Sequence, residues 1–125
     1  MRLNIKNLKK LLLMMLYSDG DNLQWMGGGG FVDHLTSVKK PEDKKMPFGW
    51  TVTANLVETM PHMINYIYET GTDIEDFVCS VSGYSYNHPK FLTDESLNQY
   101  AKDTGMMMGK ADMKYLAMKG VDKRV

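Results

Sequence analysis

The sequence predicts an α/β fold made of about three parallel βα units. Three short runs rich in apolar, aromatic or β-branched residues are separated by loops and helical patterns, and this alternation is typical of a parallel sheet. The first run lacks polar alternation, as expected of a parallel strand buried on both faces. The runs span residues 11–17, 48–53 and 77–81.

The first run also has the features of a secretory signal, because the basic segment 1–10 precedes it. It is followed by the polar turn 18–22 and not by a small-residue cleavage site. A membrane-spanning helix would need roughly 20 apolar residues, whereas a buried strand needs about 4 to 8. Its length therefore favours the strand.

Residues that mark the start and the end of helices follow the second run. Asn55 is placed to cap a helix, with Glu58 three residues later in the capping-box position. Pro61 suits the first turn of a helix, and Gly71 suits its end. The sequence therefore predicts a helix that ends at residue 71.

After the third run, Thr93 is a plausible cap for another helix, whose apolar stripe includes Leu97 and Tyr100. Gly105 is expected to interrupt that helix, because glycine weakens helix interiors. A further helical stretch is predicted over residues 112–119, with a stop at Gly120.

Composition limits the classes of partner and cofactor. Lys plus Arg and Asp plus Glu number 15 each, so charge gives no reason to expect nucleic acid or an anionic membrane. Zero net charge favours self-association, for which an exposed sheet edge offers a surface. The single cysteine, Cys79, excludes an intrachain disulfide and is interpreted as a small apolar core residue.

No cofactor is expected. The glycine run 27–30 is followed by Phe31 and Val32, whereas a phosphate-binding Walker loop needs Lys and then Ser or Thr. Residues 33–47 are polar and contain two prolines, which predicts a surface loop. The three histidines show no i, i+4 metal-binding pair.

Three blocks of residues, in this order and spacing, resemble the C-terminal domain of the GxGYxYP family of putative glycoside hydrolases. The resemblance extends over residues 10–115. The blocks are 18–25, then 47–52 with 55–56, Pro61, Tyr66 and Tyr68, then 76–78, 82–86 and 100–101.

The motif that names the family is matched in part. Gly83, Tyr84 and Tyr86 match its second glycine and its two tyrosines. Val81 and Asn87 stand in place of its first glycine and its proline.

The resemblance implies a barrel-type glycosidase architecture in a much longer, extracytoplasmic protein that acts on carbohydrate. A closed eight-stranded barrel usually takes about 250 residues. Residues 1–125 are therefore expected to form a single partial catalytic-type domain, a fragment of a (β/α) barrel.

Asp19 and Asp21 follow the first predicted strand, at the edge of a parallel sheet where active sites form. Glycoside hydrolysis needs a pair of carboxyl groups, and we expect these two to be catalytic, with Glu58 as a further partner. Two alternatives stay open: in the first, the aspartates only bond the turn backbone, and in the second, Glu58 only caps its helix. With Asn22 as a further oxygen ligand, the same spacing also suits a metal-dependent hydrolase or deacetylase.

Aromatic side chains are the expected substrate contacts, together with Asn22. Flat rings with polar tips suit stacking on a sugar, although each single ring is more often part of a core. The expected rings are those of Trp25, Trp50, Tyr84 and Tyr86. Two function classes follow: a glycosidase-like enzyme, or an inactive or carbohydrate-binding piece without a complete acid–base pair.

Overall fold

The structure is a computed structural model that describes residues 15–18, 24, 26, 29, 32–33 and 47–119. Four strands, three α-helices and a 3₁₀ turn have defined bounds among these residues. In chain order they are β1 (Leu16–Tyr17), β2 (Phe48–Val52), α3 (Leu56–Thr59), α4 (Pro61–Thr70), β3 (Glu75–Cys79), η2 (Pro89–Phe91), α5 (Asp94–Lys110) and β4 (Tyr115–Leu116).

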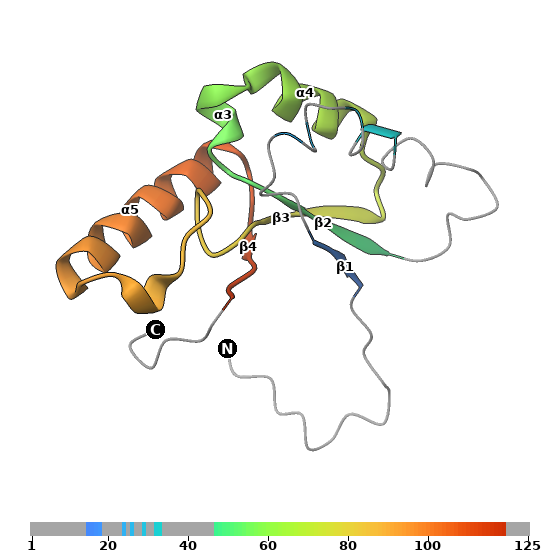
Figure 1. Ribbon diagram of the computed structural model, residues 1–125. Coiled ribbons are helices and arrows are strands. Elements are labelled where there is room, and N and C mark those ends of the chain that lie inside the picture. The colour runs from blue at the N-terminus through green and yellow to red at the C-terminus, as the bar shows by residue number, and fades with distance from the viewer. Residues whose placement is uncertain are drawn as a thin grey trace, which may run out of the picture.

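The strands form a four-stranded sheet in the order β1-β2-β3-β4, and all three neighbouring pairs are parallel (Figure 1). The register pairs Trp50 with both Tyr17 and Phe77, and Val78 with Tyr115. Each strand thus lies beside its neighbour in sequence. The predicted α/β class is confirmed.

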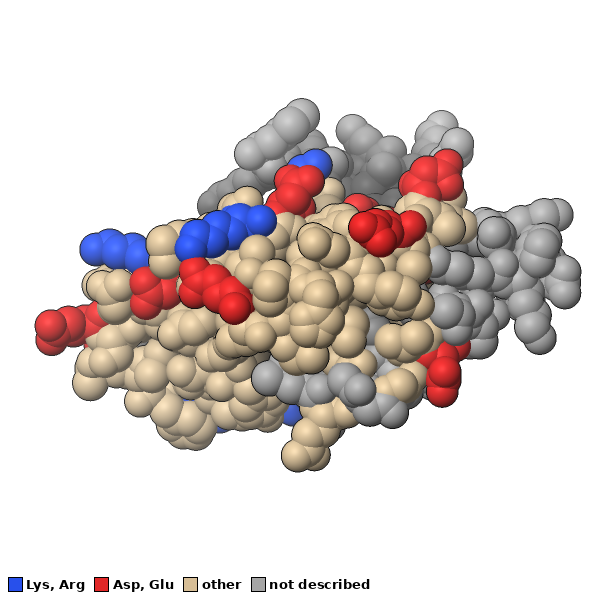
Figure 2. Space-filling view, turned by 90° about the horizontal axis from the view of Figure 1, so that it is seen from above, with Lys and Arg blue, Asp and Glu red and all other residues tan. Residues whose placement is uncertain are grey.

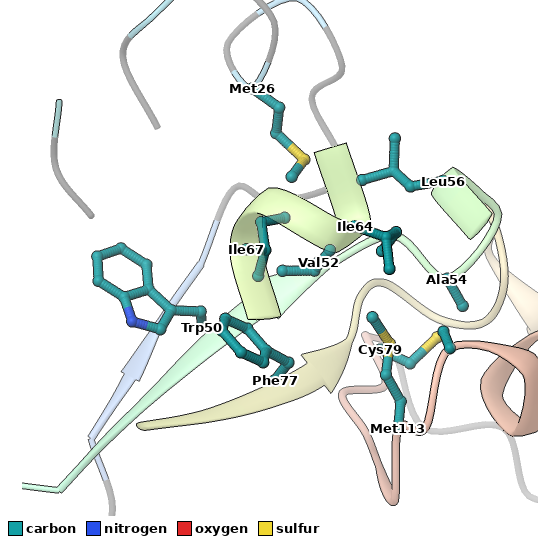
Figure 3. Packing of buried hydrophobic residues seen from close by; sticks show 11 residues of the cluster. Met26, Trp50, Val52, Ala54, Leu56, Ile64, Ile67, Phe77, Cys79 and Met113 are labelled. Atoms are coloured by element: carbon teal, nitrogen blue, oxygen red, sulfur yellow. The ribbon is translucent and has the colours of Figure 1, made fainter. Parts of the chain in front are cut away.

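A hydrophobic core fills the space between one face of the sheet and helices α3 and α4 (Figures 1 and 3). Alternate residues of a strand point to the same face, so Trp50 and Val52 of β2 face the core together. From α4, Ile64 and Ile67 pack against them, because residues three apart share one helix face. Met26 belongs to the same core cluster, and its side chain is seen near α4 in Figure 3.

The predicted ends of two helices are confirmed. Helix α4 begins at Pro61 and ends before Gly71, whose N–H donates to the Ile67 carbonyl at 2.8 Å. Helix α5 is capped by Thr93, whose side-chain oxygen accepts from the Ser96 N–H at 3.3 Å. These ends follow from the preferences of single residue types for helix termini, which can be read from the sequence.

Two expectations for the C-terminal region are wrong. Helix α5 runs through Gly105 without a break, because one glycine costs only about 0.5–1 kcal/mol relative to alanine and the neighbouring turns stay packed. The stretch 112–119 is not helical: Asp112 has a positive φ of 51° after the helix, and β4 then pairs with β3. The Ala117 N–H donates to the Cys79 carbonyl at 2.9 Å, so tertiary pairing overrides the helical pattern.

Two strands differ from the sequence-based expectation. Strand β3 lies two residues earlier than predicted, because the ladder with β2 begins at Glu75. Of the first predicted strand, residues 11–17, the structure confirms Leu16 and Tyr17 as β1, while residues 11–14 lie outside the described residues. Strand β1 is not buried on both faces, since Leu16 is 39% exposed. It pairs with β2 on one side, which leaves its other side without a described partner strand.

Charged side chains of both signs are mixed on the face seen in Figure 2, and neither sign forms a continuous patch there. None of the helices within the described ranges is long and apolar enough to cross a membrane.

Candidate functional site

The carboxyl ends of parallel strands meet at one edge of a sheet, and ligand sites in α/β folds form at that edge. The longest described segment at this edge connects β3 to α5 and is here called the β3–α5 loop, residues 80–93. It contains the Gly83, Tyr84 and Tyr86 of the partial motif. This loop is the candidate site.

The loop is held to the neighbouring strand by one carbonyl group. The Tyr84 carbonyl accepts a hydrogen bond from the Thr53 hydroxyl at 2.8 Å and another from the Asn55 N–H at 3.1 Å. Thr53 and Asn55 directly follow β2. Two hydrogen bonds to the same carbonyl group therefore join the loop after β3 to the segment after β2.

On its other side the loop packs closely against α5. A Cβ at Gly83 would lie 2.4 Å from the Tyr100 ring and 2.7 Å from the Thr104 hydroxyl, so only glycine fits. The Thr104 hydroxyl accepts from the Tyr84 N–H at 3.2 Å, and the Tyr100 hydroxyl donates to the Ser85 carbonyl. The motif glycine thus has a packing reason for its place.

A third connection joins the loop to the segment after β4. The Ser82 hydroxyl accepts from the Lys119 N–H at 2.8 Å. The loop is accordingly bonded to the segments that follow β2 and β4 and to helix α5. Such a loop holds its exposed side chains in place before a ligand arrives, which lowers the entropy cost of binding.

Cys79, the last residue of β3, contacts the loop through its side chain. Its thiol donates to the Gly83 carbonyl at 3.1 Å. Burial raises the pKa of the Cys79 thiol to about 11, so the thiol stays protonated at neutral pH. A protonated, buried thiol is a poor nucleophile, which agrees with the interpretation of Cys79 as a core residue.

Ser80 is the one buried side chain in the described part of the chain whose polar atom has no hydrogen-bond partner. Its backbone is fully bonded: the N–H donates to the Val52 carbonyl at 3.0 Å and the carbonyl accepts from the Gly83 N–H at 3.2 Å. Ser80 directly follows Cys79, the last residue of β3. An unbonded hydroxyl thus lies at the carboxyl edge.

The loop also carries a group of exposed aromatic rings. Tyr86 is 55% exposed and Phe91 is 75% exposed. The His88 ring lies between them, with centroid distances of 5.5 Å to Tyr86 and 6.0 Å to Phe91. The Lys90 ammonium lies 4.7 Å from the centroid of Phe91. These four side chains are called the loop aromatic cluster below.

A hollow lies at the opposite, amino edge of the sheet. This open cavity of about 200 Å³ is lined by residues at the start of β3 and before β4, including Glu75, Asp76, Asp112 and Lys114. Tyr68 also lines it, and burial, followed by the nearby Asp112 and Asp76 carboxylates, raises the pKa of its phenol. This edge of α/β folds is not where their active sites form.

Family comparison identifies the chain. The model of the GxGYxYP putative glycoside hydrolase C-terminal domain matches residues 9–124. The chain belongs to the GxGYxYP family. The resemblance seen in residues 10–115 is therefore confirmed and extends to nearly the whole sequence.

The fold of this GxGYxYP domain is also found in a solved structure. A crystal structure described as a putative hydrolase from Bacteroides thetaiotaomicron VPI-5482 is similar, with a TM-score of 0.68 and 24% sequence identity. The similarity covers 84% of this chain and 21% of the other, so this chain spans about a fifth of that protein's length. No curated protein matches the chain.

Four of the predicted site residues of this GxGYxYP domain lie outside the described residues. They are Asp19, Asp21, Asn22 and Trp25. The catalytic role of the two aspartates and the contacts of the other two therefore stay predictions. Ser18, directly before them, follows β1 at the carboxyl edge, where the sequence predicts them.

Glu58 has a partner that its sequence neighbourhood does not suggest. Its carboxylate pairs with the Lys110 ammonium at 2.5 Å, and both side chains are about half exposed. The predicted capping box is wrong, because the Asn55 side chain makes no cap hydrogen bond and the Asn55 N–H bonds to Tyr84. Glu58 thus links α3 to the end of α5.

The other two predicted ring contacts that the structure describes, Trp50 and Tyr84, differ from Tyr86. Trp50 is 0% exposed, its indole N–H donates to the Glu75 carboxylate at 2.9 Å, and its ring offers no open face for stacking. Tyr84 is half buried, with its ring 5.0 Å from that of Tyr100. Of the predicted ring contacts, Tyr86 is the one that the structure leaves most open to solvent among the described residues.

Sequence reasoning missed Ser80 and Phe91. No pattern distinguishes an unbonded serine from a bonded one, because the difference lies in partners that folding supplies. Phe91 follows Pro89 and Lys90 in a loop, and that polar setting was the only available signal of its exposure. Within the described ranges, no group of three or more metal-binding side chains comes together.

Proposed function

We propose that this GxGYxYP domain supplies the carbohydrate-binding carboxyl edge of a glycoside hydrolase site. The observation that carries the proposal is the β3–α5 loop, which is held by three neighbouring segments and presents Tyr86 to solvent at that edge. An exposed ring with a polar tip, held in place, is what stacking on a sugar requires. The family assignment supports the same chemistry.

The strand order supports a place in a larger barrel. Parallel strands that follow one another without reversal have the neighbour order of a (β/α) barrel. Each outer strand, β1 and β4, pairs on one side with a described strand. In the proposed whole protein, further strands pair with these two edges, and loops from those strands complete the site.

For the chemistry we propose Asp19 and Asp21 as the carboxyl groups, because glycoside hydrolysis uses an acid and a base or nucleophile. Asn22 and Trp25, beside them in sequence, would contact the substrate. Glu58 is a less suitable partner, since Lys110 already neutralises its carboxylate.

A second candidate function is carbohydrate binding without hydrolysis. The observation that favours it is the ion pair of Glu58, which leaves the described residues without an unpaired carboxylate at a predicted catalytic position. In this case the same edge binds sugar, and catalysis depends on groups from elsewhere in a longer protein.

Two measurements on the chain test these functions. Isothermal titration with hexasaccharides of glucose, mannose, xylose and N-acetylglucosamine tests binding, and release of nitrophenol from the matching glycosides tests hydrolysis. An Asp21→Asn variant should lower any hydrolysis at least tenfold, whereas Asp76→Asn at the amino edge removes the same charge and should leave it unchanged.

The outcomes separate the candidates. Hydrolysis that depends on Asp21 supports the enzyme, and binding without hydrolysis supports the second function. Absence of binding to every sugar, with a cooperatively folded chain, contradicts both.

A further inference from the structure

We infer that the loop aromatic cluster is a sugar subsite in which Phe91 stacks on the apolar face of a pyranose ring. The inference rests on the proposed function and adds to it the residues that make the contact. Phe91 is 75% exposed, the highest value among the large hydrophobic residues of the described part of the chain. A single exposed apolar residue is ordinary, but here the His88 ring adjoins Phe91, and the Tyr86 ring adjoins His88.

The backbone that carries Phe91 is held by hydrogen bonds. Phe91 ends the 3₁₀ turn η2, in which its N–H donates to the His88 carbonyl at 3.0 Å. Pro89, in the same turn, is fully buried. The Asn87 N–H donates to the Val81 carbonyl at 3.2 Å, which ties the turn to the start of the loop. The backbone of such a turn therefore loses little freedom when the ring binds.

The rings are arranged edge to face, and this determines which surfaces stay open. The His88 ring is inclined at 87° to the Tyr86 ring and at 74° to the Phe91 ring, so both pairs are edge-to-face contacts. The Tyr86 hydroxyl and His88 Nε2 lie 3.4 Å apart, which keeps both polar tips on the same side of the pair. Most of the Phe91 ring remains uncovered.

A pyranose matches this mixture of surfaces. One face of a pyranose carries C–H groups that suit an aromatic ring, while its rim carries hydroxyls that need polar partners. The Lys90 ammonium lies over the Phe91 ring, and the His88 imidazole lies next to that ring. The Tyr86 hydroxyl lies 3.4 Å from His88 Nε2. Each can bond to a sugar hydroxyl.

The test uses the full chain and the hexasaccharide that binds best among those of glucose, mannose, xylose and N-acetylglucosamine. Phe91→Ala is expected to weaken the affinity at least tenfold in isothermal titration and to leave the melting temperature within about 2 °C, because an exposed ring contributes little to the core. Phe91→Trp should keep the affinity within threefold. The matched control is Tyr115→Ala, which removes another exposed aromatic ring, 57% exposed, from β4.

The outcomes distinguish the inference from the function on which it rests. If the wild-type chain binds none of the sugars, the proposed function fails and the subsite fails with it. If the wild-type chain binds and Phe91→Ala binds equally well, only the subsite is wrong. Equal losses in Phe91→Ala and Tyr115→Ala also overturn it. So does a Phe91→Ala variant that loses self-association in size-exclusion chromatography but keeps its sugar affinity.

Discussion

Replacing Gly83 by alanine should destabilise this domain, because the new methyl group has no space. Its Cβ would lie 2.4 Å from one ring carbon of Tyr100 and 2.7 Å from the Thr104 hydroxyl. Carbon atoms in good contact lie about 3.5–4.0 Å apart, so the loop must move away from α5 by about 1 Å. That movement would also lengthen the hydrogen bond from the Tyr84 N–H to Thr104, now 3.2 Å.

The expected size follows from these two effects. Overpacking a tight site costs about 1–3 kcal/mol, and a lost hydrogen bond about 1 kcal/mol. The reduced freedom of the unfolded chain offsets about 0.4–1 kcal/mol. We therefore expect the free energy of unfolding of Gly83→Ala to fall by about 1–3.5 kcal/mol, a large part of the 5–15 kcal/mol typical of a domain.

The assay is urea unfolding followed by circular dichroism, with Gly105→Ala as the matched control. No heavy atom lies within 4 Å of a Cβ built at Gly105, which is inside α5. That variant should gain about 0.5–1 kcal/mol, because alanine is the better helix former. If Gly83→Ala proves as stable as the wild type, the loop does not pack on α5 as described and the site loses its support.

Three further predictions concern single side chains. Ser80→Ala should keep the free energy of unfolding or raise it by about 1 kcal/mol, since the Ser80 hydroxyl is buried without a hydrogen-bond partner. Thr53→Val should lower it by about 1 kcal/mol, because the hydrogen bond to the Tyr84 carbonyl is lost. Urea unfolding measures both, and a clear loss in Ser80→Ala would reveal a missed partner. The free energy of unfolding should fall as pH rises from about 9 to about 11, because the folded chain keeps the Cys79 thiol protonated after the unfolded chain has released its proton. Cys79→Ala should flatten this dependence, measured by urea unfolding at each pH, and an unchanged slope would exclude Cys79 as its source. Glu58→Gln should cost less than about 1 kcal/mol in low salt and less still in 1 M NaCl, because the pair with Lys110 is half exposed; a larger loss in thermal unfolding would mean that the pair is better shielded from water than described.

The fold was largely predictable where local rules apply. Pro61, Gly71 and Thr93 mark helix ends through backbone chemistry that needs no distant partner, and the structure places the ends there. The prediction failed for residues 112–119, where the helical pattern is real but pairing with β3 competes with it. Such pairing joins residues distant in sequence, which a local pattern does not contain.

The site was predictable only through its motif. Gly83 and Tyr86 were found by family resemblance, and the structure supplies the reason for the glycine in the contact with α5. The ion pair of Glu58 joins residues 52 positions apart, and no local rule indicates it. The exposure of Phe91 depends on the path of the whole loop, so it is visible only in three dimensions.

The most direct test of the central claim is to map sugar binding by ¹H–¹⁵N NMR on the labelled chain, titrated with the hexasaccharide that binds best. Binding at the carboxyl edge predicts that the largest amide shift changes fall in the β3–α5 loop, residues 80–93, with smaller changes after β2. Shift changes confined to the amino-edge cavity around Thr72 and Asp76 would contradict the assignment of this edge as the functional one.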